Sequence, residues 1–411
     1  MQAFTRSQHE PIPPLRTIDI TEFYHQGQPA LLLRDPLRLG DNHVVLPRAL
    51  APALSLMDGT DDLHELHAEL LLRFRMNVPV DVLQQLVEVL DDVYMLDNRR
   101  SAEARERALL AYRAAPYRPP MMAGQSYPAE PRQLAQLLDG YLGAVNGAGP
   151  ASAAGRGVIS PHIDYPRGGP VYAAVWKRAA EMARAADLVI LLGTDHYSTG
   201  DRITLTRQSY ATPYGVLPTD VTLVDALAAA VGEDAAYAGE LRHRGEHSLE
   251  LVATWLHHMR GGKPVAMAPI LTGSFMDFVM GQGDPAGDRQ IGAFLNVLSA
   301  ALAGHNVLVV ASGDLAHVGP AFGGAPVDAA GRQGIVDADR GLMSELAAGR
   351  ADGFFGAIKR VRDRNNVCGV SPFYLMLKLL GSVEGQTVAY DQCPADAGNT
   401  SLVSVCGMVF G

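Results

Sequence analysis

The chain has 411 residues, of which 48% are apolar and 19% charged; this suffices for about two or three packed domains and excludes wholesale disorder. Its 34 basic and 44 acidic residues give a formal net charge of −10, which argues against binding nucleic acid or anionic membranes through bulk charge. Three cysteines are too few for a disulfide framework. The first residues lack the apolar core of a signal peptide, and no stretch reaches the roughly 18 apolar residues of a membrane span. We therefore predict a cytoplasmic protein without membrane contact.

A proline-rich stretch at residues 115–120 divides the chain. Before it, two short apolar segments at 30–33 and 43–46 predict a β-hairpin, and two segments with leucines at helical spacing follow. Small strands with amphipathic helices are typical of a winged-helix-like module, which we place at 17–100. Residues 101–122 are then a linker.

From residue 158 onward, continuous apolar strands alternate with helices, as in a parallel sheet covered on both sides. Strands are predicted at 158–163, 188–193, 265–271, 307–311, 387–390 and 402–410. Helices are predicted at 170–184, 221–231, 248–259, 291–302 and 372–380. The fold class is therefore α/β, with a mostly parallel sheet and helices on both faces, over residues 123–411. The segment 143–157 is rich in Gly, Ala and Ser and predicts a flexible connection.

Three of the predicted strands are followed by a histidine with an aspartate nearby. His162 follows the first, His196 the second, and His317 follows the strand at 307–311. Since the carboxyl ends of parallel strands meet at one sheet edge, we expect these imidazoles to converge. Histidine is the commonest ligand for transition metals and the usual acid or base near neutral pH.

Cys368 is a fourth candidate because it immediately precedes a predicted helix. A helix N-terminus lowers the pKa of a nearby thiol, and the thiolate can bind a metal or attack an electrophile. The alternative is a buried structural cysteine. Cys393 and Cys406 lie in apolar, strand-like segments and are predicted to be core residues.

The segment 243–247 reads HRGEH and matches the zinc-peptidase pattern H-x-x-E-H. That chemistry needs His243 and His247 on one helical face, whereas Gly245 interrupts the segment and the apolar period starts later. A zinc hydrolase is therefore the third functional hypothesis. The alternative places Glu246 and His247 at the site as supporting or substrate-contacting groups. The consecutive His257 and His258 are predicted to lie at the solvated surface.

Five ordered motifs resemble the MEMO family, also called AmmeMemoRadiSam system protein B. They read SPHIDYPRGGPVYA, LLGTDHYS, EHSLE, VVASGDLAHVG and NNVCGVSP, and the segment AGQSYPAEPRQLAQLLDGYL resembles the start of that family. The resemblance covers residues 123–411. It implies the fold of the class III extradiol dioxygenases, an α/β sheet with a metal site at the strand ends.

The resemblance further implies the metal ligands, which fall on His162, His196, His317 and Cys368. The dioxygenases use a carboxylate where this chain has Cys368, and the softer thiolate favours iron or copper in a redox or binding role. The expected cofactor is Fe(II), with copper second and zinc third.

His317 is expected to be a fourth ligand or the general acid/base, oriented by Asp314. The residues expected to contact substrate are Asp164, Tyr165, Tyr197, Glu246 and His247. Asp164 and Tyr197 are also departures from the usual family pattern. The predicted function is a non-haem metal oxidoreductase acting on a small or peptide-borne substrate. The alternative is a non-catalytic adaptor that binds metal and peptide.

The segment 17–100 resembles a PqqD-like peptide-binding winged helix in its motifs LRDP, LMDG and LDDVYMLDN. That resemblance implies recruitment of a peptide. The name of the system implies a radical-SAM enzyme and an AMMECR-type protein as partners.

Overall fold

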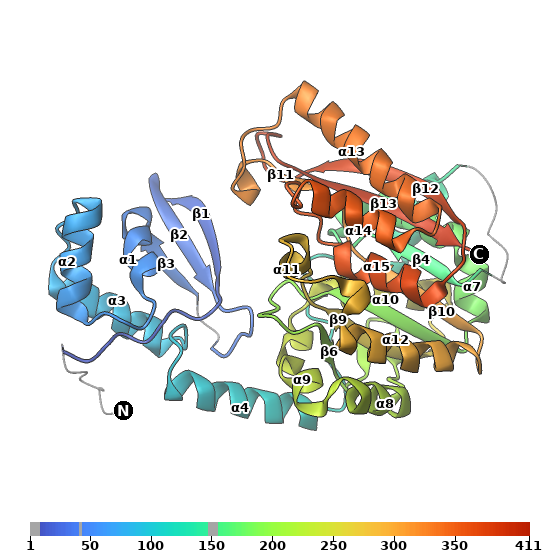
Figure 1. Cartoon of the computed structure of the whole chain (residues 1–411), viewed down its shortest axis with the longest axis horizontal. Helices are drawn as coiled ribbons and strands as arrows, with labels where there is room; N and C mark the ends of the chain where they lie inside the picture. The colour runs from blue at the N-terminus through green and yellow to red at the C-terminus, as the bar shows by residue number, and fades with distance from the viewer. Residues whose placement is uncertain (1–8, 41–42, 147–154) are drawn as a thin grey trace. The chain divides into compact units, whose positions relative to one another are not determined.

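The computed structural model describes residues 9–40, 43–146 and 155–411, and the chain divides into two compact units at residues 114 and 115 (Figure 1). The predicted flexible segment 143–157 falls largely outside the described residues. In the described ranges, no helix is both long enough and apolar enough to cross a bilayer.

The first unit contains a three-stranded antiparallel sheet in the order β1-β2-β3. Its strands are β1 (Asp19–His25), β2 (Gln28–Arg34) and β3 (Val44–Pro47). The pairing of β2 with β3 confirms the predicted hairpin. β1 was not predicted because its sequence, DITEFYH, is exposed along most of its length and shows no apolar alternation.

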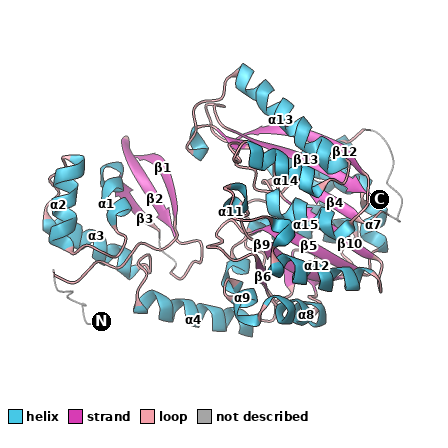
Figure 2. Cartoon of the chain, viewed as in Figure 1, coloured by secondary structure: helices cyan, strands magenta, loops and turns pink. Residues whose placement is uncertain are grey.

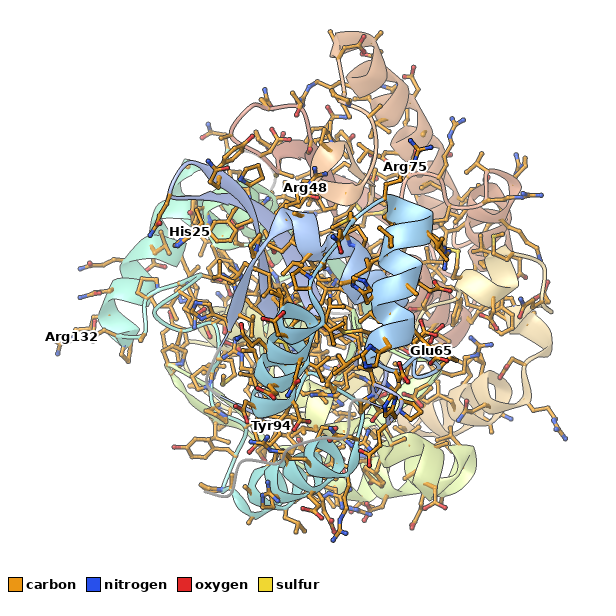
Figure 3. The ribbon with its side chains drawn as sticks, turned by 90° about the vertical axis from the view of Figure 1, so that its left-hand side faces the viewer. His25, Arg48, Glu65, Arg75, Tyr94 and Arg132 are labelled. Atoms are coloured by element: carbon orange, nitrogen blue, oxygen red, sulfur yellow. The ribbon has the colours of Figure 1, made fainter. Side chains whose placement is uncertain are left out.

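Four helices complete the first unit: α1 (Ala51–Leu56), α2 (Leu63–Phe74), α3 (Val80–Asp92) and α4 (Arg99–Ala114). α2 begins at a capping box, in which Asp62 accepts from the Glu65 amide and the Glu65 side chain accepts from the Asp62 amide. Figure 3 shows α2 with Glu65 near its start and Arg75 just past its end. α4 occupies much of the segment predicted as a linker. The small antiparallel sheet is compatible with a winged helix, which stays a prediction.

The second unit contains an eight-stranded sheet in the order β11-β13-β4-β10-β5-β9-β6, with β12 paired to β13 (Figure 2). Its strands are β4 (Gly157–Ser160), β5 (Leu188–Thr194), β6 (Ile203–Leu205), β9 (Ala266–Thr272), β10 (Val307–Ser312), β11 (His317–Val318), β12 (Gly385–Pro394) and β13 (Leu402–Phe410). The central strands β4, β10, β5 and β9 are parallel, and the outer strands pair antiparallel. A separate ribbon joins β7 (Tyr210–Thr212) to β8 (Gly215–Leu217).

Helices pack on both faces of this sheet and bury it, as the continuous apolar strands predict. Along β5, Ile190 and Leu192 enter one hydrophobic core, whereas Val189 and Leu191 enter the other. The first core is covered by α8 (Val221–Val231), α9 (Glu233–Tyr237), α11 (Met276–Val279), α12 (Arg289–Leu302), α13 (Ala329–Ala347), α14 (Ala351–Arg360) and α15 (Val370–Leu380). The second is covered by α5 (Pro131–Ala144), α6 (Tyr165–Arg178), α7 (Ala180–Ala185) and α10 (His247–Met259).

The helix predicted at 170–184 differs from the one found. α6 starts earlier because Asp164 caps it by accepting from the Arg167 amide and because Pro166 suits its first turn. The chain then breaks at Ala179 and continues as α7.

The parallel strands define the edge that carries the candidate site. Ser160 at the end of β4 pairs in register with Ser312 at the end of β10, and β5 ends beside them at Thr194. The loops that follow these strands therefore leave the sheet side by side, although the loop after β10 is more than a hundred residues from the other two along the chain.

Candidate metal centre

Four side chains that could hold a metal ion converge around the buried imidazole of His162. Its Nε2 lies 3.2 Å from the Sγ of Cys368 and 3.8 Å from the Oδ2 of Asp314. Its ring centroid lies 5.0 Å from that of His196 and 5.3 Å from that of His247. Two sets of possible ligand atoms result, one from the three histidines and one from His162, Asp314 and Cys368. His162 belongs to both.

His162 presents a neutral imidazole whose Nε2 faces the centre. The Ser312 hydroxyl donates to the Ser248 carbonyl, which leaves its oxygen to accept from His162 Nδ1 at 3.4 Å. With the proton on Nδ1, the lone pair of Nε2 is free to bind a metal. Burial, together with the neighbouring His196, holds the pKa of His162 well below its usual value.

Cys368 lies just before α15, between the end of β10 and the histidines. Its Sγ accepts a hydrogen bond from the Asp314 amide at 3.2 Å, and the Cys368 carbonyl accepts from the Thr194 hydroxyl at 3.1 Å. We predicted a lowered thiol pKa from the helix N-terminus. That prediction is wrong for the metal-free chain, since burial raises the pKa of Cys368 although His196 opposes the rise. A bound metal would supply the positive charge that stabilises the thiolate.

Glu246 holds the other side of the centre. Its carboxylate lies 3.0 Å from the Nδ1 of His196 and 3.2 Å from the Nδ1 of His247, and it accepts from the Ser248 amide as the cap of α10. The His196 and His247 rings stack with centroids 4.9 Å apart. Burial opposes protonation of His196, but Glu246 and Cys368 outweigh it and raise its pKa well above the usual value. The pKa of His247 is lowered by burial.

A buried ion pair fixes the segment that delivers Glu246 and His247. The guanidinium of Arg118 donates to the Glu250 carboxylate at 2.6 Å, to the His243 carbonyl at 2.6 Å and to the Glu246 carbonyl at 2.9 Å. Glu250 also accepts from the Tyr127 hydroxyl at 2.6 Å. Nothing in the sequence indicated a role for Arg118, because an arginine in a proline-rich segment carries no local signal of burial.

Asp314 does not have the partner that we predicted for it. Its Oδ1 accepts from the His162 amide at 2.9 Å, so its carboxylate faces His162, whereas His317 Nδ1 faces the carbonyls of Leu315 and Asn366 at 3.2 and 3.1 Å. The expectation that Asp314 orients His317 is therefore wrong: backbone carbonyls do so. Burial raises the pKa of Asp314 to about 7.

His317 lies at the margin of the centre and in neither set of possible ligand atoms. Burial lowers its pKa to about 4, helped by the nearby His196. Because Nδ1 donates to carbonyls, Nε2 carries the lone pair, and His317 is a neutral base near pH 7. Its role as ligand or acid/base stays a prediction.

Two predicted substrate contacts have structural partners instead. Tyr165 is wholly buried in the second core, where its hydroxyl donates to the Leu251 carbonyl at 2.6 Å, so the prediction that it faces substrate is wrong. Asp164 caps α6, and its carboxylate also binds the Arg167 guanidinium at 2.7 Å. Tyr197 is half-buried beside His196, and its substrate role stays a prediction.

The zinc-peptidase pattern does not form one cluster. His243 lies in a short 3-10 turn and points away from His247, with Nδ1 2.7 Å from the Tyr210 hydroxyl and Nε2 3.0 Å from the Thr204 carbonyl. Both of its ring nitrogens are thus engaged within the fold.

The consecutive histidines near the end of α10 are not on the solvated surface as predicted. His257 is buried and hydrogen-bonds the Thr212 hydroxyl, and His258 bonds Tyr214. Almost every residue of α10 is buried, so these two polar side chains are enclosed together with the apolar ones around them. Cys393 and Cys406 are buried core residues, as predicted.

Comparison with known proteins agrees with this architecture. The family model of Memo-like proteins matches residues 118–409. A MEMO1 family protein of Aquifex aeolicus is 28% identical over 410 residues, covering 97% of this chain and 99% of its own length. One from Methanopyrus kandleri is 27% identical and covers 71% of this chain and 98% of its own, and the memo-1 homolog of Caenorhabditis elegans is 27% identical over 261 residues. This chain belongs to the Memo-like family.

Proposed function

We propose that this protein is a metal-dependent oxidoreductase that holds iron, or else copper, at the His162 centre. The observation that carries the proposal is the placement of the Cys368 thiol 3.2 Å from the Nε2 of His162, beside His196, at the carboxyl edge of the sheet. Imidazole and thiolate together suit transition metals of intermediate softness.

The donor set fits such an ion. His162 offers a lone pair at Nε2, and Cys368 offers sulfur already hydrogen-bonded by the Asp314 amide. His196 would release its proton on binding, because the ligand form of imidazole is neutral. His247 lies close enough to bind in place of Cys368 or beside it. When bound, iron or copper would supply one-electron chemistry and a site for dioxygen.

The surrounding residues would prepare substrate and move protons. Glu246 fixes His196 and His247 through its carboxylate, as outer partners of metal ligands commonly do. His317, neutral near pH 7, would take a proton from substrate at its Nε2. Asp314, with a pKa of about 7, would hold or release a proton beside His162.

Metal analysis of the protein purified without oxygen tests the proposal. We expect stoichiometric iron or copper in the wild-type chain and its loss in His162→Ala and in Cys368→Ala. Matched controls are His305→Ala, at an exposed histidine, and Cys393→Ala, at a buried cysteine outside the centre. Metal-free wild-type protein, or equal metal in His162→Ala, would contradict the proposal.

Turnover is tested separately with His317→Gln. We expect this variant to keep its metal and lose oxygen uptake with catechols or peptides, the substrates that a dioxygenase-like site and a peptide-binding module suggest. Loss of metal would make His317 a ligand instead. A loaded wild-type protein that consumes no oxygen with either substrate class would favour the non-catalytic adaptor.

The first unit extends the proposal to a partner. We infer that residues 17–100 form a PqqD-like module that recruits a peptide to the metal centre, in a system with a radical-SAM enzyme and an AMMECR-type protein. Support comes from the small antiparallel sheet with its helices.

Zinc hydrolysis through His243 and His247 is disfavoured by the engaged ring of His243. If the His243→Ala variant keeps its metal, the zinc-hydrolase hypothesis is excluded.

A further inference from the structure

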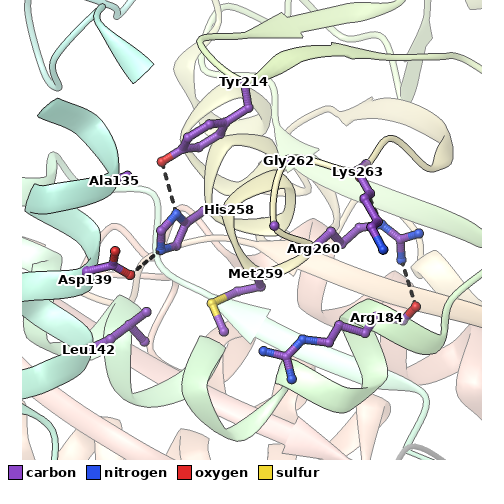
Figure 4. A pocket seen from close by; sticks show the side chains of 11 residues that line it. Ala135, Asp139, Leu142, Arg184, Tyr214, His258, Met259, Arg260, Gly262 and Lys263 are labelled. Carbon is purple, nitrogen blue, oxygen red and sulfur yellow. Dashed lines mark hydrogen bonds and ion pairs between the residues drawn. The ribbon is translucent and has the colours of Figure 1, made fainter. Parts of the chain in front are cut away.

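A cavity opens at the other end of α10, away from the metal centre. Its volume is about 730 Å³, within the range of small-molecule sites. α10 has 13 residues, so about 20 Å of helix separates His247 at one end from Met259 at the other. The cavity is therefore a separate site, built on α5, α7 and the loop that follows α10 (Figure 4).

One side of this cavity is basic. Arg184, Arg260 and Lys263 contribute to its lining, in a chain whose net charge is −10. Arg260 is fixed in place, because its guanidinium donates to the carbonyls of Arg184 at 3.3 Å and Ala186 at 3.1 Å. Lys263 is exposed, and within the described ranges no side-chain hydrogen bond or ion pair engages its ammonium.

The opposite side of the cavity combines three hydrogen-bonded polar side chains with apolar surface. Figure 4 shows His258 between the Tyr214 hydroxyl and the Asp139 carboxylate, at 3.0 and 3.2 Å. These contacts occupy both ring nitrogens of His258. Tyr214 and Met259 supply apolar surface next to them.

We propose that this cavity binds a small organic anion, with its carboxylate or phosphate at Arg184 and Lys263 and its apolar body against Tyr214 and Met259. Arg184 pairs with Glu181 at 2.6 Å at the surface, an exchangeable contact worth little in water. Guanidinium and ammonium groups form strong charge-assisted hydrogen bonds with both kinds of anion. The lining carries three cations, Arg184, Arg260 and Lys263, against the single carboxylate of Asp139, so it has a surplus of positive charge.

Titration calorimetry with benzoate and with phenyl phosphate tests this site. We expect saturable binding of at least one, and at least tenfold weaker binding of inorganic phosphate and of benzyl alcohol, which lack the body and the charge respectively. Binding of benzoate alone identifies a carboxylate site, and of phenyl phosphate alone a phosphate site. Absence of saturable binding of both up to about 10 mM would overturn the proposal.

Variants locate the binding. Lys263→Gln with Arg184→Gln should weaken it at least tenfold, and Ala135→Phe should block it by filling the cavity without changing charge. The double variant Arg105→Gln with Arg340→Gln removes the same charge elsewhere and should bind like wild type. Equal weakening in that control, or unchanged binding in both pocket variants, would show nonspecific attraction and overturn the proposal. None of these residues belongs to the metal centre, so the variants should keep the metal content of the wild type, and this test is independent of the function proposed above.

Discussion

Buried charged side chains have many partners at the start of α10 and few on α13. At α10, Arg118, Glu246 and Glu250 are almost wholly buried, yet each has several partners. On α13, Asp339 is equally buried, but only its Oδ2 has a partner, the Tyr390 hydroxyl at 2.9 Å. Its Oδ1 accepts no hydrogen bond from the part of the chain that the structure describes.

The difference shows which buried charges the fold depends on. A charge removed from water is tolerated when hydrogen bonds and an opposite charge replace the lost hydration, and it is costly otherwise. The α10 charges meet that condition and fix the residues of the metal centre. Asp339 meets it only in part. Neutral substitutions at the two places should therefore change stability in opposite directions.

The largest effect is expected for Arg118→Met. It leaves the Glu250 carboxylate buried without its cation, which should lower the free energy of unfolding by about 3–5 kcal/mol. Urea unfolding of metal-free protein measures the loss. The double variant Arg118→Met with Glu250→Leu is the matched control, since removing both charges should restore much of the stability. A double variant as unstable as the sum of both single changes would contradict this account.

Glu246→Gln is expected to have the next effect. Burial opposes ionisation of Glu246, but His196, His247 and the Ser248 amide outweigh it and hold the pKa well below its usual value. A lowered folded-state pKa means that stability is present above the unfolded value near 4.5 and is lost as the pH falls further. The neutral amide should therefore lower stability at pH 7 by about 1.5–3 kcal/mol.

The same variant should weaken metal binding by about 10- to 100-fold, because His196 and His247 lose their common partner. Competition with a chelator measures the affinity. Glu240→Gln, at another buried glutamate that accepts from the Thr206 hydroxyl, is the control and should leave metal affinity unchanged. Full affinity in Glu246→Gln would place the glutamate outside the centre.

The sequence predicted the parts of the site that follow strands. His162 and His196 converge because the parallel strands before them are marked by apolar runs, and strand ends share an edge. Cys368 was found by its position before a helix. Fold class followed from the same alternation of strand and helix.

What the sequence did not reveal depends on contacts between distant segments. Arg118 is 132 residues from Glu250, and nothing near either residue signals their pairing. The partner of Asp314 was mistaken because it lies only three positions before His317 along the chain, whereas the fold turns its carboxylate toward His162. His247 was expected to support the site, and only the fold shows that its ring nitrogen lies close enough to those of His162 and His196 to bind metal itself.

The smallest effect, and the one of opposite sign, is expected for Asp339→Asn. Burial raises the pKa of Asp339 to about 6, with partial compensation by the Tyr390 hydroxyl. The folded chain therefore holds a proton that the unfolded chain has released between about pH 4 and 6, so wild-type stability should rise as the pH falls through that window. The amide should raise stability at pH 7 by about 2 kcal/mol and remove that part of the pH dependence. Urea unfolding of both proteins at pH 5 and 7 measures it, with Asp337→Asn, an exposed neighbour on α13, as control. Should Asp339→Asn destabilise the chain at pH 7, the buried carboxylate is compensated after all, and the contrast with α10 fails.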